Sequence, residues 1–101
     1  MRNAIRIVKE ERAMGSRYVA RIDGVAGEAQ LLFTIRSKEL ISADHTEAPD
    51  SMRGKGVALA LVEHMVADAR AAGFKIVPVC PYVLAQSKKH PEWGDVIAAP
   101  A

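Results

Sequence analysis

The sequence predicts one domain of the α+β class, in which an antiparallel meander of about four strands is followed by a helix, a strand and a second helix. Three observations support this. The chain has 101 residues, about the size of one domain, and half of them are apolar. Short segments of its first half alternate apolar and polar residues between turn residues. From Val57 onward, apolar residues recur at three- and four-residue steps. We therefore expect residues 1–101 to share a single core.

The first half contains four segments with the alternation of strands. They are 4–9 (AIRIVK), 17–22 (RYVARI), 29–36 (AQLLFTIR) and 40–46 (LISADHT). Asp23-Gly24 is a strong short-range turn signal, so the second and third segments should form a hairpin. The third segment is more continuously apolar and should be more buried. The fourth should end before Pro49, because proline cannot donate to a strand ladder.

The second half opens with an amphipathic helix of about four turns. Its apolar positions are Val57, Leu61, Val62, Met65, Val66 and Ala69. Charged residues occupy the other faces, and Gly73 stands where a C-terminal cap belongs. This spacing predicts that one stripe of the helix packs on the sheet.

Three shorter elements should complete the chain. Residues 74–79 (FKIVPV) read as a strand, and Pro78 indicates an edge or a local break in its pairing. Residues 82–89 have helical spacing, with Pro91 beyond their end. Residues 95–98 suggest a further short strand.

Composition argues against several classes of protein. The net charge of +2 comes from 14 basic and 12 acidic residues, with no aromatic residues interleaved among the cations, so we expect no nucleic-acid binding. Apolar runs are interrupted well before the roughly 20 residues of a membrane span, and the N-terminus lacks a secretory pattern. A lone thiol, Cys80, suits a reducing compartment, which favours the cytoplasm. The histidines and Cys80 show no metal-ligand spacing, so we expect no zinc.

The stretch 51-SMRGKGVALALVEHM-65 places two glycines and two cations directly before the long helix. The first turn of a helix leaves backbone amides without partners, and the helix dipole makes that end partly positive. Gly54 and Gly56 remove side chains that would keep a phosphate at a distance, while Arg53 and Lys55 add positive charge. The stretch therefore indicates a phosphate-binding turn. The alternative is an ordinary strand-to-helix turn with solvated cations.

Two common nucleotide motifs do not fit this stretch, which lacks the spacing of a P-loop and of a dinucleotide fold. The pattern Arg53-x-x-Gly56-x-Ala58, between a strand and a helix, resembles instead the (Q/R)-x-x-G-x-(G/A) signature of the GNAT superfamily of N-acetyltransferases. The words HTE, RGKG, Pro-x-Cys and HPEW further resemble a subfamily of minimal GNAT-like proteins. The resemblance covers nearly the whole second half of the chain.

The resemblance implies that the protein binds acetyl-coenzyme A. The pyrophosphate would lie on the loop and the start of the helix, at Arg53, Gly54, Lys55, Gly56, Val57 and Ala58. The pantetheine arm would bond to the strand end around Thr46 and Ala48, where the superfamily separates its fourth and fifth strands. Only residues 10–16 connect the first two strands here, so the first two helices of the superfamily fold should be missing.

Three side chains are candidates for catalysis. His45 and Glu47 lie two apart on one strand, so both should point to one face, and either could take the proton of an amine. Cys80 follows the strand that would flank the thioester and could accept the acetyl group. Each also has a plainer interpretation, as a hydrogen-bonded histidine, a solvated carboxylate and a small buried hydrophobe. Tyr82 does not match the position of the tyrosine that many members use as an acid.

Three functions remain open on the sequence. The first is an N-acetyltransferase for a small amine or a protein amino group. The second is a coenzyme A-binding module without catalysis, working with a partner chain. The third is an interaction domain in which the RGKG loop is only a turn. We expect a monomer or a weak homodimer, with an edge near Pro78 available for pairing.

Overall fold

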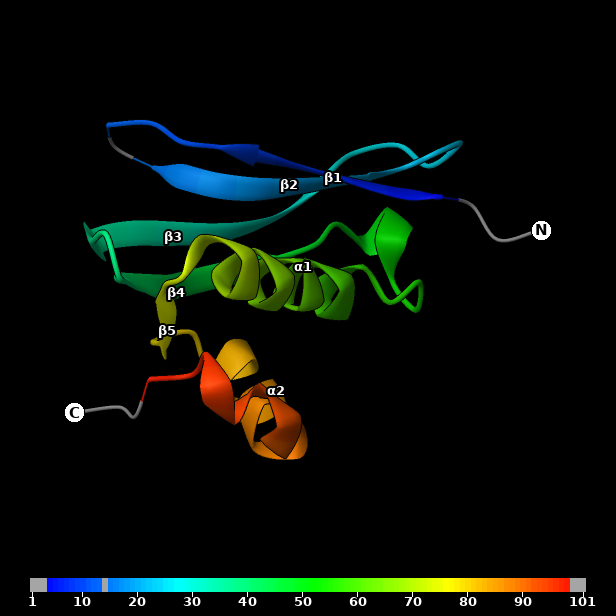
Figure 1. Cartoon of the computed structure of the whole chain (residues 1–101). Helices are drawn as coiled ribbons and strands as arrows, with labels where there is room; N and C mark the ends of the chain where they lie inside the picture. Colours follow the sequence, from blue (N-terminus) through cyan, green and yellow to red (C-terminus); the bar gives the residue numbers. More distant parts are fainter. Residues whose placement is uncertain (1–3, 14, 99–101) are drawn as a thin grey trace.

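The computed structural model describes residues 4–13 and 15–98, and all structural statements below concern these residues. A five-stranded sheet has the order β1-β2-β3-β4-β5 (Figure 1). Its neighbours are antiparallel except β4 and β5, which run parallel with α1 between them in the chain. The elements are β1 (Ile5–Glu10), β2 (Ser16–Ile22), β3 (Ala29–Ser37), β4 (Leu40–Glu47), α1 (Val57–Ala72), β5 (Lys75–Pro78) and α2 (Pro81–Lys89). The fold is α+β and GNAT-like, as the sequence predicted.

Most predicted elements are confirmed to within one or two residues, but the last one is wrong. Pro91–Asp95 form a 3₁₀ helix, and the following residues make only an isolated parallel bridge, between Ile97 and Ile76. Trp93 lies in the middle of this turn and is 5% exposed, with its ring stacked on that of His90 at a centroid distance of 4.1 Å. The tail is therefore held by ring burial and by one bridge rather than by a strand.

One face of the sheet carries the core. Helix α1 lies across this face (Figure 1) and buries the predicted stripe from Val57 to Ala69 against β2 and β3. Polar contacts also join α1 to the first two strands. Asp68 of α1 accepts hydrogen bonds from the ammonium of Lys9 on β1 at 2.8 Å and from the hydroxyl of Tyr18 on β2 at 2.6 Å. The helix is thus fixed by packing along its length and by charge toward its C-terminal end.

The opposite face of the first strands is open to solvent. Arg6, Val8 and Arg21 project from this face, and all three are exposed. The connection between β1 and β2 spans only 11–15 and contains no helix in its described part. The two helices that were predicted to be missing are therefore absent from this connection. None of the described helices is both long enough and apolar enough to span a membrane.

Candidate functional site

Two glycines shape the turn that leads into α1. Gly54 and Gly56 have φ angles of 75° and 73°, in the left-handed region that other residues rarely adopt. A Cβ placed on either glycine would meet nothing within 4 Å, so backbone rotation rather than crowding favours glycine here. Gly56 is also the N-cap of α1, and no side chain caps the helix. The turn consequently presents bare backbone to solvent.

The amides of this turn are largely without partners. Lys55 donates to the carbonyl of Met52 at 3.2 Å, and Ala60 starts the helical ladder by donating to Gly56 at 3.0 Å. The amides that find no acceptor within the described part of the chain belong to Gly54, Gly56, Val57, Ala58 and Leu59. Because the helix dipole is positive at this end, such a cluster favours an anion.

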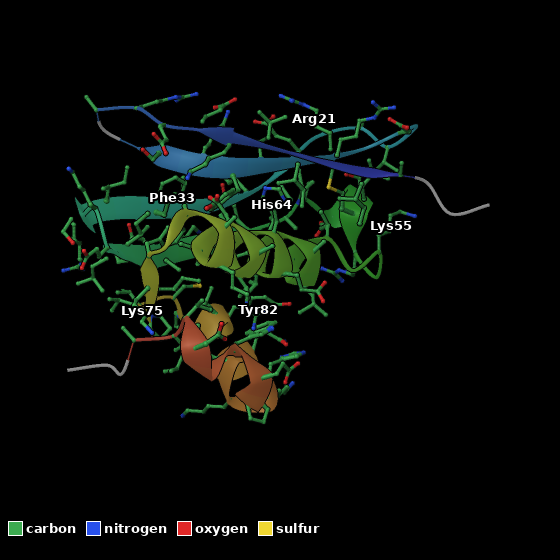
Figure 2. All side chains as sticks on the ribbon, in the orientation of Figure 1. Arg21, Phe33, Lys55, His64, Lys75 and Tyr82 are labelled. Atoms are coloured by element: carbon green, nitrogen blue, oxygen red, sulfur yellow. The ribbon has the colours of Figure 1, made fainter. Side chains whose placement is uncertain are left out.

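Charge around the turn points the same way. Lys55 is exposed on the loop at the N-terminal end of α1 (Figure 2), and the first turn of the helix contains no acidic residue. Arg53 pairs with Asp50 at 3.1 Å, but both side chains are more than four-fifths exposed. Such a pair is weak in water, so Arg53 can exchange this carboxylate for a bound anion at little cost.

The turn borders an open pocket of about 190 Å³. Its lining combines the loop, the first helical turn, the end of the preceding strand and one residue of α2: Ala48, Met52, Arg53, Gly54, Gly56, Val57, Ala58, Leu59 and Tyr82. Ala48 connects the pocket to the end of β4. Of the residues that the resemblance proposed for the cofactor, only Lys55 and Thr46 lie outside this lining. The structure thus gathers most of them at one hollow.

Strands β4 and β5 separate next to this hollow. Their pairing ends at Ala43 and Pro78, and the amide of Cys80 then donates to the Ala43 carbonyl at 2.8 Å before the chain turns into α2. A bulge at Asp44 shifts the register of β4 against β3 at the same level. Beyond it, the described residues place no strand along the outer side of 44–47. The proposed separation of the two strands is present.

Cys80 lies at this separation, on the side of the core. The thiol is 3% exposed, and its Sγ lies 3.5 Å from Oγ1 of Thr46. Thr46 pairs with the buried Leu31, which places its side chain on the face that α1 covers. The structure therefore brings together Cys80 and Thr46, which the sequence had assigned to different roles.

His45 and Glu47 project from the other face of β4. Their side chains are 60% and 56% exposed, and Nε2 of His45 lies 3.5 Å from Oε2 of Glu47. They share one face, as their spacing requires, but it is the face opposite Cys80 and Thr46. The three candidate catalytic residues are thus divided between the two sides of the strand.

A row of hydrogen bonds holds Glu47 from the neighbouring strands. Its Oε1 accepts from the amide nitrogen of Gln30, and the amide oxygen of Gln30 accepts from Arg17 at 2.9 Å. Arg17 in turn donates to Glu10 of β1 at 2.9 Å. The sequence analysis missed Gln30 and Arg17, although their alternation in β2 and β3 could have placed them on the face of Glu47.

Tyr82 lines the pocket, although the sequence did not predict it as a site residue. It stands at the start of α2 and faces the loop of α1 across the pocket. Burial, with added repulsion from the Glu63 carboxylate, raises the pKa of Tyr82 above its ordinary value. The phenol is protonated at neutral pH even at its ordinary pKa of about 10, so it can donate a hydrogen bond. Its position depends on how α2 folds back, which no local pattern shows.

The strand separation, the glycine turn and the free amides thus lie together at one end of β4 on a GNAT-like fold. The family model of the GCN5-related N-acetyl-transferases matches residues 17–96, and the chain belongs to this family. Proteins named Protein NATD1 from chicken (Gallus gallus) and human (Homo sapiens) are each 28% identical to it over 74 residues. That match covers 73% of this chain and 67% and 66% of the two relatives, about two thirds of their length.

Proposed function

We propose that this protein binds acetyl-coenzyme A at the start of α1 and transfers the acetyl group to an amine that is still unidentified. One observation carries the proposal: the unpartnered amides of Gly54 and of residues 56–59 border a hollow that reaches the end of β4. A diphosphate needs several donors in one small region, and a helix start with glycines supplies them. Arg53 and Lys55 add charge at the rim.

The residues present fit this cofactor. The amides of the turn would hold the pyrophosphate, and the unpaired side of β4 at Thr46, continued by Ala48, would hold the amide groups of the pantetheine arm. A strand edge bonds such amides as it would bond another strand. Val57 and Leu59 provide apolar surface within the same hollow. No residue needs to move for the loop amides to be accessible.

Acetyl-coenzyme A supplies a thioester carbon that an amine can attack. The residues of this chain would handle the protons: Glu47 or His45 takes one from the incoming amine on the open face. Tyr82 lines the pocket and is protonated at neutral pH, so it would give one to the departing sulfur. Proton removal and proton delivery are thus assigned to different sides of the strand separation.

Cys80 offers a covalent variant of the same reaction. Its Sγ would take the acetyl group with release of the coenzyme A thiol, and the amine would then take the acetyl group from the sulfur. The thiol is buried against Thr46, so this route requires the pocket to open locally around it. Labelling decides between the direct and the covalent routes.

One structural observation favours a second candidate function, a coenzyme A-binding module without catalysis. The connection between β1 and β2 is too short for the two helices that usually help to build the acceptor pocket of the superfamily. A chain that binds the cofactor but lacks an acceptor pocket would act with a partner that supplies one.

The resemblance also places the chain in the minimal GNAT-like subfamily, and the lone Cys80 suits a cytoplasmic location.

Titration of ¹⁵N-labelled protein with acetyl-coenzyme A tests the cofactor site. We expect amide shifts at Gly54 and Gly56–Leu59, followed by smaller shifts at Thr46 and Ala48. Shifts confined to another part of the molecule would refute the site. Coenzyme A keeps both the pyrophosphate and the pantetheine arm, so it should give the loop shifts and those at Thr46 and Ala48. 3′,5′-ADP lacks the arm and carries only single phosphates, so it should give weaker loop shifts and none at Thr46.

Incubation with ¹⁴C-acetyl-coenzyme A and a panel of amines then separates the two functions. Transfer to an amine supports the enzyme, and label retained on Cys80 by intact mass supports the covalent route. Binding without transfer or hydrolysis supports the module.

A further inference from the structure

Strand β1 leaves one edge of the sheet open. It is the outermost strand (Figure 1), and no other strand in the described part of the chain pairs with its outer side. Its register with β2 runs without interruption from Ile5 to Glu10, and the strand contains neither proline nor a bulge. Prolines and bulges are features with which proteins commonly protect an edge strand. The charged residues Arg6, Lys9 and Glu10 are the protection that remains, so the edge can accept a strand that matches these charges.

The hydrogen-bond pattern shows which groups of β1 face outward. The carbonyl of Ala4 accepts from the amide of Asp23 at 3.3 Å, and these two residues lie one step beyond the terminal strand pair Ile5–Ile22. Bonded and non-bonded pairs alternate along an antiparallel ladder, so the even-numbered residues direct their backbone groups to β2. The backbone groups of Ile5, Ile7 and Lys9 therefore point away from the sheet.

The side chains of β1 are arranged symmetrically about Val8. Val8 is 53% exposed, and Arg6 and Glu10 stand two residues to either side of it on the same open face. If a second copy pairs antiparallel with its Val8 opposite Val8, Arg6 of each copy lies opposite Glu10 of the other. Moving the centre of this register by two residues in either direction brings Arg6 opposite Arg6 or Glu10 opposite Glu10, and a register centred on Lys9 removes the two Arg6–Glu10 pairs. The intermediate register, centred on Ile7, forms no opposite-charge pair on this face.

The charged groups have spare capacity for these contacts. Arg6 binds Asp23 through Nε and Nη2, which leaves Nη1, and Glu10 accepts both of its hydrogen bonds from described residues through Oε1, which leaves Oε2. On the other face of β1, the ammonium of Lys9 is held by Asp68 and is not free to repel an incoming strand. A second strand thus meets complementary charge on the open face and a neutralised lysine on the other.

We propose that β1 is a homodimer interface in which two copies pair edge to edge, with Val8 on the two-fold axis, to form one continuous ten-stranded sheet. The occupant is a second copy because the charge pattern of the strand is its own complement in this register. The contact spans about 20 Å of a single strand, so the dimer is weak and forms with increasing concentration. The edge near Pro78 is a poorer candidate, since Ile97 bridges the outer side of Ile76.

Sedimentation and amide hydrogen exchange over about 10 µM to about 1 mM protein test this interface. The amides of Ile7 and Lys9 should exchange rapidly in the monomer and gain about tenfold protection in the dimer, while those of Arg6 and Val8 are protected in both. A protein that is monomeric over the whole range overturns the proposal. So does a dimer in which Ile7 and Lys9 stay unprotected.

Cysteine cross-linking tests the register. In a Cys80→Ser background, Val8→Cys should form a disulfide-linked dimer under mild oxidation, and Ile35→Cys, an exposed control on β3, should not. Arg6→Glu and Glu10→Arg should each weaken dimerisation about tenfold, and the double variant should restore it. Arg36→Glu serves as the matched charge control, and circular dichroism establishes that every variant folds. Equal cross-linking at both cysteine positions, or a double variant that stays monomeric, refutes the register.

Discussion

The two halves of β4 belong to one strand and have different environments. Leu40–Ala43 lies between β3 and β5, and its core residues Ile41 and Ala43 are 5% and 0% exposed. Asp44–Glu47 is bonded to β3 alone, and His45 and Glu47 are more than half exposed. The bulge at Asp44 marks the change. The half of β4 that pairs on both sides belongs to the core, and the half that pairs on one side contains the candidate catalytic residues His45 and Glu47.

The difference teaches how a small domain makes a site without a deep cavity. A strand with two neighbours has no backbone groups to offer, whereas one that loses a neighbour exposes them to a ligand. Leu40–Ala43 positions the elements around the site, because its parallel pairing with β5 places the ends of α1 and the start of α2 next to β4. Stability and binding should therefore respond to different residues.

The largest expected effect is a loss of ligand binding without a loss of folding. Gly56→Glu should abolish binding of acetyl-coenzyme A, because a carboxylate would occupy the place of the pyrophosphate, while the protein still folds. Gly73→Glu is the matched control, since Gly73 ends the same helix with a φ of 83° and pays the same backbone strain far from the loop. Calorimetric titration measures both variants. Unchanged affinity in Gly56→Glu would show that the loop is not the anion site.

The next effect concerns the paired half of β4. Ile41→Ala should lower the free energy of unfolding by about 2–5 kcal/mol, because a buried side chain is removed from the core. His45→Ala, four residues later on the same strand, should change it by less than about 0.5 kcal/mol. Urea denaturation measures both. A similar loss in the two variants would mean that the open half also carries the fold.

Conservative changes of the open half should affect transfer but not binding. Glu47→Gln should reduce the rate of acetyl transfer by about 100-fold if the carboxylate takes the amine proton. Gln30→Ala should give a smaller loss, because it only releases Glu47 from its hydrogen bond. The ratio of kcat to KM with an accepted amine, with acetyl-coenzyme A affinity as the control, measures this. Full activity in Glu47→Gln would leave His45 as the base.

Cys80 stands between the halves, and its replacement should have a modest effect. Cys80→Ala should lower the stability by about 1 kcal/mol through the loss of a buried sulfur, with binding nearly intact. Any acetyl label on the protein should disappear, as intact mass can show. A label that persists would place the covalent step on another residue.

The smallest effect lies far from β4, on the packed face. Burial alone would raise the pKa of Asp68, but hydrogen bonds from Lys9 and Tyr18 outweigh it and lower this pKa. The contact therefore contributes stability above the unfolded pKa of about 3.9, and this stability is lost as pH falls through the lower folded value. Asp68→Asn should remove about 1 kcal/mol at pH 7 and little at pH 2, measured by thermal unfolding. An equal loss at both pH values would mean that packing, not charge, is responsible.

Sequence patterns predicted the elements well because each is set by local periodicity. The alternation in the first half and the stripe from Val57 to Ala69 gave the sheet and α1, and Pro78 correctly indicated the end of β5. The strand predicted at residues 95–98 is wrong, because an apolar tail after Trp93 can be held by one isolated bridge as well as by a strand. Local patterns do not distinguish these outcomes.

The arrangement of the site was less predictable, since it depends on contacts between distant segments. The loop from Arg53 to Ala58 was found because helix starts have a recognisable chemistry. The division of His45 and Cys80 between two faces was not found, because the bulge at Asp44 has no sequence signal here. The place of Tyr82 in the pocket lining also had no local signal, because it depends on how α2 folds back beside β4 and β5.

The hydrogen bond between Gln30 and Glu47 also restricts what the open face can recognise. With one oxygen engaged by Gln30, Glu47 offers an approaching cation only the other, which His45 adjoins at 3.5 Å. A guanidinium group binds carboxylates best through two parallel contacts, whereas a primary ammonium needs a single acceptor. In the proposed reaction, this face would therefore favour an alkyl amine over a guanidinium group.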